Sequence, residues 1–239
     1  MRDLRNYGTR KQPNAGLGEA LVHSVDEGFD AIHKYDAQIT ELSRRYHIRK
    51  AMIQAVVLWE YWGWNELDHP TDLSHLTTGH PNDPTTGIAQ IMAGTAICSR
   101  NWAVRAHLIP GIILSGQCGE KNLESDQEKA IGGCSGLVDD TNDPAQTRRV
   151  RELVWRSLYS DDAYNISTVP VVLLCGAAAT LGSQAVPNLL DAGVKIYSGP
   201  ELVKIFGRYN GFGDAAARYG EAVLGVYHIF EEYNSVIRG

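Results

Sequence analysis

Glu60 stands at the end of a run of apolar residues, in a position where an acid can do chemistry. In the segment "RKAMIQAVVLWE", Ile53, Val57 and Glu60 recur at i, i+4 and i+7, so a helix would place the carboxylate on its apolar face. Burial of an ionised, unpaired carboxylate costs several kcal/mol, so such a group is protonated, paired or used in a reaction. A carboxylic acid that stays protonated near neutral pH can protonate the leaving oxygen of a glycosidic bond.

Aromatic residues follow this acid directly. Tyr61, Trp62 and Trp64 offer flat apolar surfaces on which sugar rings can stack, and this makes Tyr61 a candidate for substrate binding. From residue types alone, a structural carboxylate that pairs with an arginine or caps a turn is the simpler interpretation, because structural ion pairs also perturb pKa values. The segment by itself therefore leaves both roles open.

A second carboxylate would decide between two glycosidase mechanisms. Inverting enzymes place it roughly 6.5 to 9.5 Å from the acid, where it activates a water molecule. Asp68, Asp72 and Asp83 lie between Glu60 and the segment "GIAQIM", and Asp83 is the nearest of them to that segment. Aspartate also forms turns beside proline and asparagine, which is the simpler interpretation of each. Asp83 is the candidate for a second catalytic carboxylate.

Other reactive residue types show no recognised motif. His69, His75 and His80 lie in the same loop, but their spacing matches no compact zinc site. Cys134 lies in the polar segment "GGCSG" without an identifiable histidine partner. The segment "GFGD" at 211–214 follows no strand that would indicate a nucleotide site. We therefore expect no metal and no cofactor.

The composition argues against two classes of function. The 239-residue chain has a net charge of -6, so it lacks the basic excess with which proteins attract nucleic acid. Its longest apolar run, "VPVVLLCGAAATLG" from Val169, is shorter than the roughly 20 residues that cross a bilayer. We expect a core helix there, with Pro170 in its first turn. The N-terminal segment has basic residues but no apolar run behind them, so no signal peptide is expected in this sequence.

The four cysteines show no C-x-x-C spacing, which argues against the usual zinc and redox motifs. Cys175 lies in the apolar run and is expected to be a core thiol. Cys118 and Cys134 flank a polar segment and could form a disulfide within a loop, although sequence alone fixes no pairing.

The elements that must position these residues are expected to be mainly helices. Residues 1–28 are rich in glycine, asparagine and charge and are expected to form a mobile lead-in, followed by one domain at 29–239. A polar, glycine-rich segment at 115–145 indicates an insertion, which extends over about 98–160. Apolar residues recur at helical spacing in the segments 35–46, 49–60, 88–108, 147–159, 165–193, 199–211 and 214–237.

Four segments, in order, resemble the lytic transglycosylase and goose-type lysozyme family, glycoside hydrolase family 23. The segment "IRKAMIQAVVLWE" resembles the helix that leads into the catalytic glutamate of that family, and "TTGIAQIMAGTA" resembles its "GLMQIMPxTA" segment. The segment "DDAYNI" resembles its Asn-Ile element, and "RYNGFGDAAARYGEAVLGVY" resembles its closing "AYNxG...Y...V...Y" motif. The resemblance extends over residues 35 to 230 and implies a mainly α, lysozyme-like helical domain with an inserted polar loop.

The resemblance implies roles for individual residues. Glu60 would be the general acid and later the general base. Asn165 would hold the substrate near this acid, Tyr209 would place its hydroxyl against Glu60, and Asn210 would shape the same wall. The remaining residues implied to line the cleft are Gly87, Ile88, Gln90 and Ile91.

The implied activity is that of a lytic transglycosylase, which cleaves the MurNAc-β-1,4-GlcNAc bond of peptidoglycan with a single glutamate. A hydrolytic lysozyme or a chitinase on the same scaffold is the alternative enzyme. Tyr61 replaces the usual serine of the family and Ala89 replaces its usual methionine, so a non-catalytic glycan-binding module is the alternative from another class. The expected partner is peptidoglycan or a chitin-like polysaccharide, with an inhibitor or immunity protein as a further candidate. The expected location is extracytoplasmic: secreted, periplasmic or delivered to the cell wall.

Overall fold

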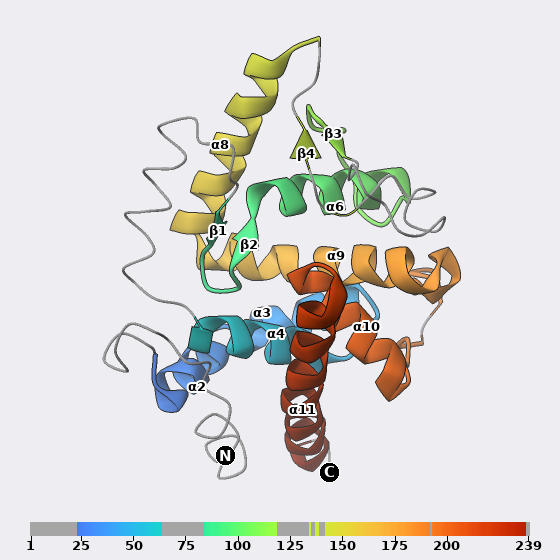
Figure 1. Cartoon of the computed structure of the whole chain (residues 1–239). Coiled ribbons are helices and arrows are strands. Elements are labelled where there is room, and N and C mark those ends of the chain that lie inside the picture. The colour runs from blue at the N-terminus through green and yellow to red at the C-terminus, as the bar shows by residue number, and fades with distance from the viewer. Residues whose placement is uncertain are drawn as a thin grey trace.

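The computed structural model describes residues 23–63, 84–118, 134, 137–138, 142–191 and 193–237. Over these residues the fold is mainly helical, as the sequence predicts, with two short antiparallel strand pairs (Figure 1). The helices are α2 (Val25–Lys34), α3 (Asp36–Arg45), α4 (Lys50–Gly63), α6 (Ala93–Arg105), α8 (Pro144–Ser160), α9 (Asp162–Leu181), the 3₁₀ helix η2 (Ser183–Ala185), α10 (Gly199–Asn210) and α11 (Gly213–Ile237). The strands are β1 (Thr85–Thr86), β2 (Ile91–Met92), β3 (Gln117–Cys118) and β4 (Leu137–Val138).

Two helices with long fully buried stretches form the centre of the core. Every residue of α4 from Ala51 to Leu58 is buried, and so is every residue of α9 from Val169 to Ala179. A helix that is apolar on all sides is stable only where its neighbours cover it. In this fold α11 packs along α10 and α4, and α9 packs against α6 and α10 (Figure 1). The surrounding helices therefore provide the cover that α4 and α9 need.

Helix α9 is longer than its apolar run. It begins at Asp162, where the carboxylate of Asp161 caps the helix by accepting a hydrogen bond from Tyr164 N at 3.0 Å. Pro170 thus lies inside the helix, and the prediction that it begins the helix is wrong, because the polar residues ahead of it already form helical turns. Among the described helices, α9 alone has the length and composition to cross a membrane, but most of its apolar window is buried inside this fold.

Helix α2 begins before the predicted domain boundary. Ser24 and Glu27 form a capping box: Ser24 Oγ accepts from Glu27 N at 3.2 Å, and the Glu27 carboxylate accepts from Ser24 N at 2.6 Å. The helix packs against α4 and α3. Residues 23–28 therefore belong to the fold, and the expected mobile lead-in is wrong for them. The rest of that segment, residues 1–22, lies outside the described residues.

The predicted insertion at about 98–160 contains regular structure. It includes most of α6, the strand pair of β3 with β4, and the whole of α8. Disulfide Cys98–Cys118 joins α6 to β3 within it, and Cys134–Cys175 ties it to α9. Both cysteine predictions are wrong, because Cys175 is not a free thiol and Cys118 does not pair with Cys134. The observed pairing depends on the packing of α9 beside α6, which no spacing in the sequence reveals.

Candidate active site

Glu60 lies in the last turn of α4, where this buried helix reaches a pocket of about 290 Å³. We call it the active-site pocket. Trp59, Tyr209 and Tyr219 supply aromatic walls from α4, α10 and α11. The β1–β2 turn supplies Gln90 beside them. The acid thus lies in a pocket lined by elements from both halves of the chain.

Burial dominates the acidity of this carboxyl group. Burial raises the pKa of Glu60 to about 7, although the hydrogen bond from Tyr219, which stabilises the ionised form, opposes the rise. The Tyr219 hydroxyl donates this bond to Oε1 of Glu60. Burial also raises the pKa of Tyr219 well above its ordinary value, so the phenol keeps its proton and remains a donor. Glu60 can therefore carry a proton at neutral pH, as a general acid must.

The hydroxyl group that contacts Glu60 is not the predicted one. Tyr209 lines the active-site pocket, but its hydroxyl donates to Ala89 O at 2.7 Å. Tyr219 occupies the expected place, with its ring stacked on Tyr209 at 6.5 Å between centroids and edge-on to Trp59 at 6.4 Å. The prediction for Tyr209 is therefore corrected: it fixes the turn that contains Ala89, while Tyr219 contacts the acid.

The turn between β1 and β2 depends on two residues with positive φ. Gly87 has φ of 72° and Gln90 has φ of 46°. Both the backbone N–H and Nε2 of Gln90 donate to Gly87 O, at 3.0 and 2.8 Å, and Thr85 Oγ1 donates to Oε1 of Gln90 at 2.9 Å. The side chain of Gln90 is thereby held in place at the wall of the pocket.

Asn165 holds this turn and does not face the pocket. Its Nδ2 donates to Thr86 O at 2.9 Å and to Leu158 O at 3.1 Å, and its Oδ1 accepts from Ala89 N at 2.9 Å. The side chain is completely buried. The prediction that Asn165 holds the substrate is therefore wrong, because its side chain is completely buried and both amide atoms bond to backbone groups. Asn165 therefore affects the site indirectly, by fixing the β1–β2 turn.

The other predicted residues divide into two groups. Besides Glu60, Gln90 and Tyr209, the pocket is lined by two further residues from the predicted set, Ile91 and Asn210. Gly87 and Ile88 are buried in the turn and do not line the pocket. Tyr61 is not among the lining residues either, and its ring stacks on His23 with centroids 4.2 Å apart. Asp83 lies outside the described residues, as do Asp68, Asp72 and the three loop histidines.

Several lining residues were not predicted. They are Trp59, Gly63, Thr85, Met92, Thr95, Val172 and Tyr219. Tyr219 had a signal in the sequence, since it is the tyrosine that follows "YNG" in the closing motif, but the contact with the acid was assigned to the earlier tyrosine. Val172 had none, because an apolar residue in the middle of a core helix looks the same whether it faces a pocket or another helix.

Comparisons of the chain with known proteins do not assign it to a family. The chain matches no family model, no curated protein and no solved structure. Within the described residues, no three His, Cys, Asp or Glu side chains come together as a metal site would need. The argument for function therefore depends on the pocket itself.

Proposed function

We propose that this chain is a peptidoglycan-cleaving lytic transglycosylase with a lysozyme-like domain, in which Glu60 is the single acid/base. The observation that carries the proposal is a glutamate with a pKa of about 7 in a pocket with aromatic walls. Such a carboxyl group can donate a proton at neutral pH and accept one later in the same cycle. The aromatic rings of Trp59, Tyr209 and Tyr219 offer surfaces for sugar rings.

The proposed reaction has two steps at one carboxyl group. Glu60 gives its proton to the glycosidic oxygen while the N-acetyl oxygen of the substrate attacks the anomeric carbon and forms an oxazolinium-like ring. The Glu60 carboxylate then takes the proton of the C6 hydroxyl, whose oxygen closes the anhydro ring and opens the oxazolinium. Among the described residues that line the pocket, Glu60 is the one carboxylate, which suits a mechanism that needs no second acid.

We also propose an extracytoplasmic location. Disulfides persist in oxidising compartments and are rare in the cytosol. All four cysteines of this chain are paired in two disulfides. A location in which peptidoglycan is exposed is consistent with this chemistry.

The test is the mass of products released from purified peptidoglycan. We expect fragments with anhydro-muramoyl ends, which are one water lighter than hydrolysed ends. Hydrolysed ends would instead identify a lysozyme, with Asp83 as the first candidate for the second carboxylate. Release of oligosaccharides from chitin would identify a chitinase, and saccharide binding without any product would identify a glycan-binding module.

The matched variants are Glu60→Gln and Glu221→Gln. Glu60→Gln keeps the shape of the side chain but cannot donate a proton as an acid, so turnover should fall by at least about 10³-fold. Glu221 is exposed on α11 and does not line the active-site pocket, so Glu221→Gln should retain wild-type turnover. Substantial turnover by Glu60→Gln would overturn the assignment of Glu60.

A further inference from the structure

A second pocket lies at the opposite end of α4 from Glu60. It has a volume of about 600 Å³, within the usual range of ligand sites, and it shares no lining residue with the active-site pocket. Lys50 lines it and is ten positions before Glu60, so the two pockets are about 15 Å apart along the helix. Helices α3, α4 and the C-terminal part of α11 form its walls.

The charged residues that line this second pocket are mainly basic. Arg44, Arg49 and Lys50 face it, against a single acid, Asp36. Lys50 Nζ pairs with Asp36 Oδ1 at 2.6 Å. Arg49 pairs with Glu231 at 3.5 Å between NH1 and Oε2, a distance longer than a normal hydrogen bond of this type. With Glu231 included, three bases face two acids, so the site keeps a net charge of +1 that suits an anion.

Buried polar atoms beside these charges have unused hydrogen-bonding capacity. Asn234 and Gln54 are 5% and 1% exposed, and Asn234 Nδ2 donates to Gln54 Oε1 at 2.8 Å. Within the described residues, each of these two amides forms this one side-chain hydrogen bond, although a carboxamide can form four hydrogen bonds. Oε1 of Glu231 is also buried, and it has no hydrogen-bond partner among the residues that the structure describes. Unsatisfied buried polar groups are rare in folded proteins and call for an explanation.

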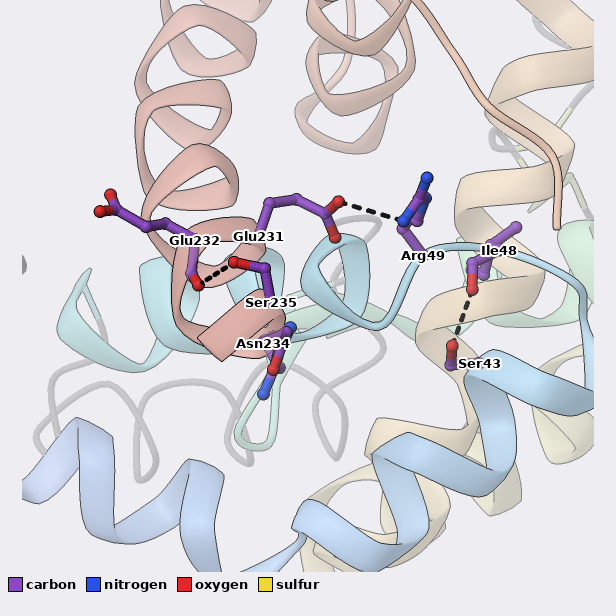
Figure 2. A network of polar contacts seen from close by, with 8 residues as sticks. Ser43, Ile48, Arg49, Glu231, Glu232, Asn234 and Ser235 are labelled. Carbon is purple, nitrogen blue, oxygen red and sulfur yellow. Dashed lines mark hydrogen bonds and ion pairs between the residues drawn. The ribbon is translucent and has the colours of Figure 1, made fainter. Parts of the chain in front are cut away.

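The polar groups lie on both sides of the pocket. Figure 2 shows Arg49, at the start of α4, joined to Glu231 on α11, with Asn234 farther along the same helix. Asn234 lines the second pocket, and Gln54 lines a smaller cavity of about 180 Å³ that shares His33, Asp36 and Tyr233 with it. One of the two amides thus faces each cavity.

These features match the chemistry of a sugar that carries a carboxylate. Sugar hydroxyls both donate and accept hydrogen bonds, which is what the free ends of the Asn234 and Gln54 amides require. The guanidinium of Arg49 can bind a carboxylate through two parallel bonds. The ring of Tyr233, 37% exposed at the rim, offers a face for a sugar ring. We propose that the second pocket is a separate binding site for an acidic saccharide.

The test uses two probes that differ in one group. N-Acetylmuramic acid and N-acetylglucosamine share a ring and an N-acetyl group, and only the first carries a carboxylate. Binding is measured by calorimetry and by NMR on the full-length Glu60→Gln protein, which prevents turnover. We expect N-acetylmuramic acid to bind at least about tenfold more tightly, with shifts at Tyr233 and Asn234.

Three variants locate the binding. Arg49→Gln should weaken N-acetylmuramic acid by about tenfold, and Arg49→Lys should have an intermediate effect, because it keeps the charge and loses the two-bond geometry. Asn234→Asp keeps the shape of the side chain and adds a negative charge, so it should also weaken binding. Arg45→Gln is the matched control, since Arg45 is exposed on the same helix as Arg44 and does not line the second pocket. Thermal unfolding of each variant verifies the fold.

Specific outcomes would overturn the proposal. The first is equal affinity for N-acetylmuramic acid and N-acetylglucosamine. The second is an affinity for inorganic phosphate or acetyl-dialanine equal to that for N-acetylmuramic acid. The third is binding of N-acetylmuramic acid that Arg49→Gln leaves unchanged in a folded protein. The inference does not depend on the proposed reaction. A chain that cleaves no peptidoglycan but binds N-acetylmuramic acid through Arg49 would overturn the proposed function and support the second site.

Discussion

At the scale of single residues, the site is governed by two opposing effects on one carboxyl group. Burial raises the pKa of Glu60, and the Tyr219 hydroxyl lowers it by stabilising the ionised form. Burial is the larger effect, and the result is a pKa of about 7. Tyr219 thus adjusts the pH range over which Glu60 holds its proton.

The variant Tyr219→Phe should move this range upward. Removing the hydroxyl removes the effect that lowers the pKa of Glu60, so the carboxyl group should keep its proton to a higher pH. If Glu60 acts as the acid, the alkaline limb of the pH profile of kcat/KM moves to higher pH. The profile is measured between about pH 4 and 9 with soluble peptidoglycan fragments.

The control for this shift is Tyr209→Phe. Its hydroxyl donates to Ala89 O, so its loss should leave the alkaline limb in place even where it reduces the rate. An unchanged limb in Tyr219→Phe, in a folded protein, would show that the hydrogen bond does not set the acidity of Glu60.

Residue spacing predicted part of this site. The position of Glu60 at i+7 on an apolar stripe and the segment "GIAQIM" both identify residues that line the pocket. The error for Asn165 has a physical origin: an asparagine near a predicted site can bind substrate or backbone, and only its complete burial distinguishes the two. Tyr209 and Tyr219 lie on different helices, and their relative distance from Glu60 depends on how α10 and α11 pack.

At the scale of elements, the β1–β2 turn is held from outside by α9. Asn165 bonds to Thr86, Ala89 and Leu158, and its side chain fills the space where a Cβ atom at Gly87 would lie. A Cβ atom at Gly87 would lie 2.1 Å from Asn165 Nδ2 and 2.3 Å from Leu158 O, and its φ of 72° is costly for any residue with a side chain. This glycine is therefore required by both contact and conformation.

The variant Gly87→Ala should destabilise the protein by at least about 2 kcal/mol and displace Gln90 and Ile91 from the pocket wall. The measurement is the free energy of unfolding in urea, together with turnover. Gly199→Ala is the control, because a Cβ atom there meets nothing within 4 Å and its φ is not positive. Equal stability of the two variants would contradict this account of the turn.

Helices were easier to predict than their ends. The periodicity located α3, α10 and α11 because each carries its own apolar stripe, while α4 stands out as a nearly continuous apolar run. The ends depend on local caps, such as Ser24 with Glu27, which lie ahead of the first apolar residue. Helix α8 and the end of α6 were placed within an insertion because their apolar stripes face neighbours that the sequence does not specify.

At the scale of the whole molecule, two disulfides attach the middle of the chain to the core. The half-cystines Cys98, Cys134 and Cys175 are all nearly inaccessible to solvent. Cys134–Cys175 closes a separation of 41 residues and Cys98–Cys118 one of 20. In the chain-entropy description the longer loop gives more stability, about 4 against about 3 kcal/mol.

Replacing each pair by serine should therefore lower the free energy of unfolding, more for Cys134→Ser with Cys175→Ser than for Cys98→Ser with Cys118→Ser. The measurement is urea unfolding of both double variants beside the wild type. Adding a reductant to the wild type should lower the free energy of unfolding by the sum of the two losses. Adding it to either double variant should remove only the contribution of the disulfide that remains. A wild-type transition that reductant leaves unchanged would show that the disulfides do not stabilise the fold.

The contact between Gly87 and Asn165 also limits how such a sequence can change by descent. A side chain gained at 87 overlaps the buried amide of 165, while a loss of the amide at 165 removes its bonds to Thr86 O, Ala89 N and Leu158 O. A change at either position alone should therefore destabilise the turn. The two residues are 78 positions apart in the chain, and we expect related sequences to keep or change them together.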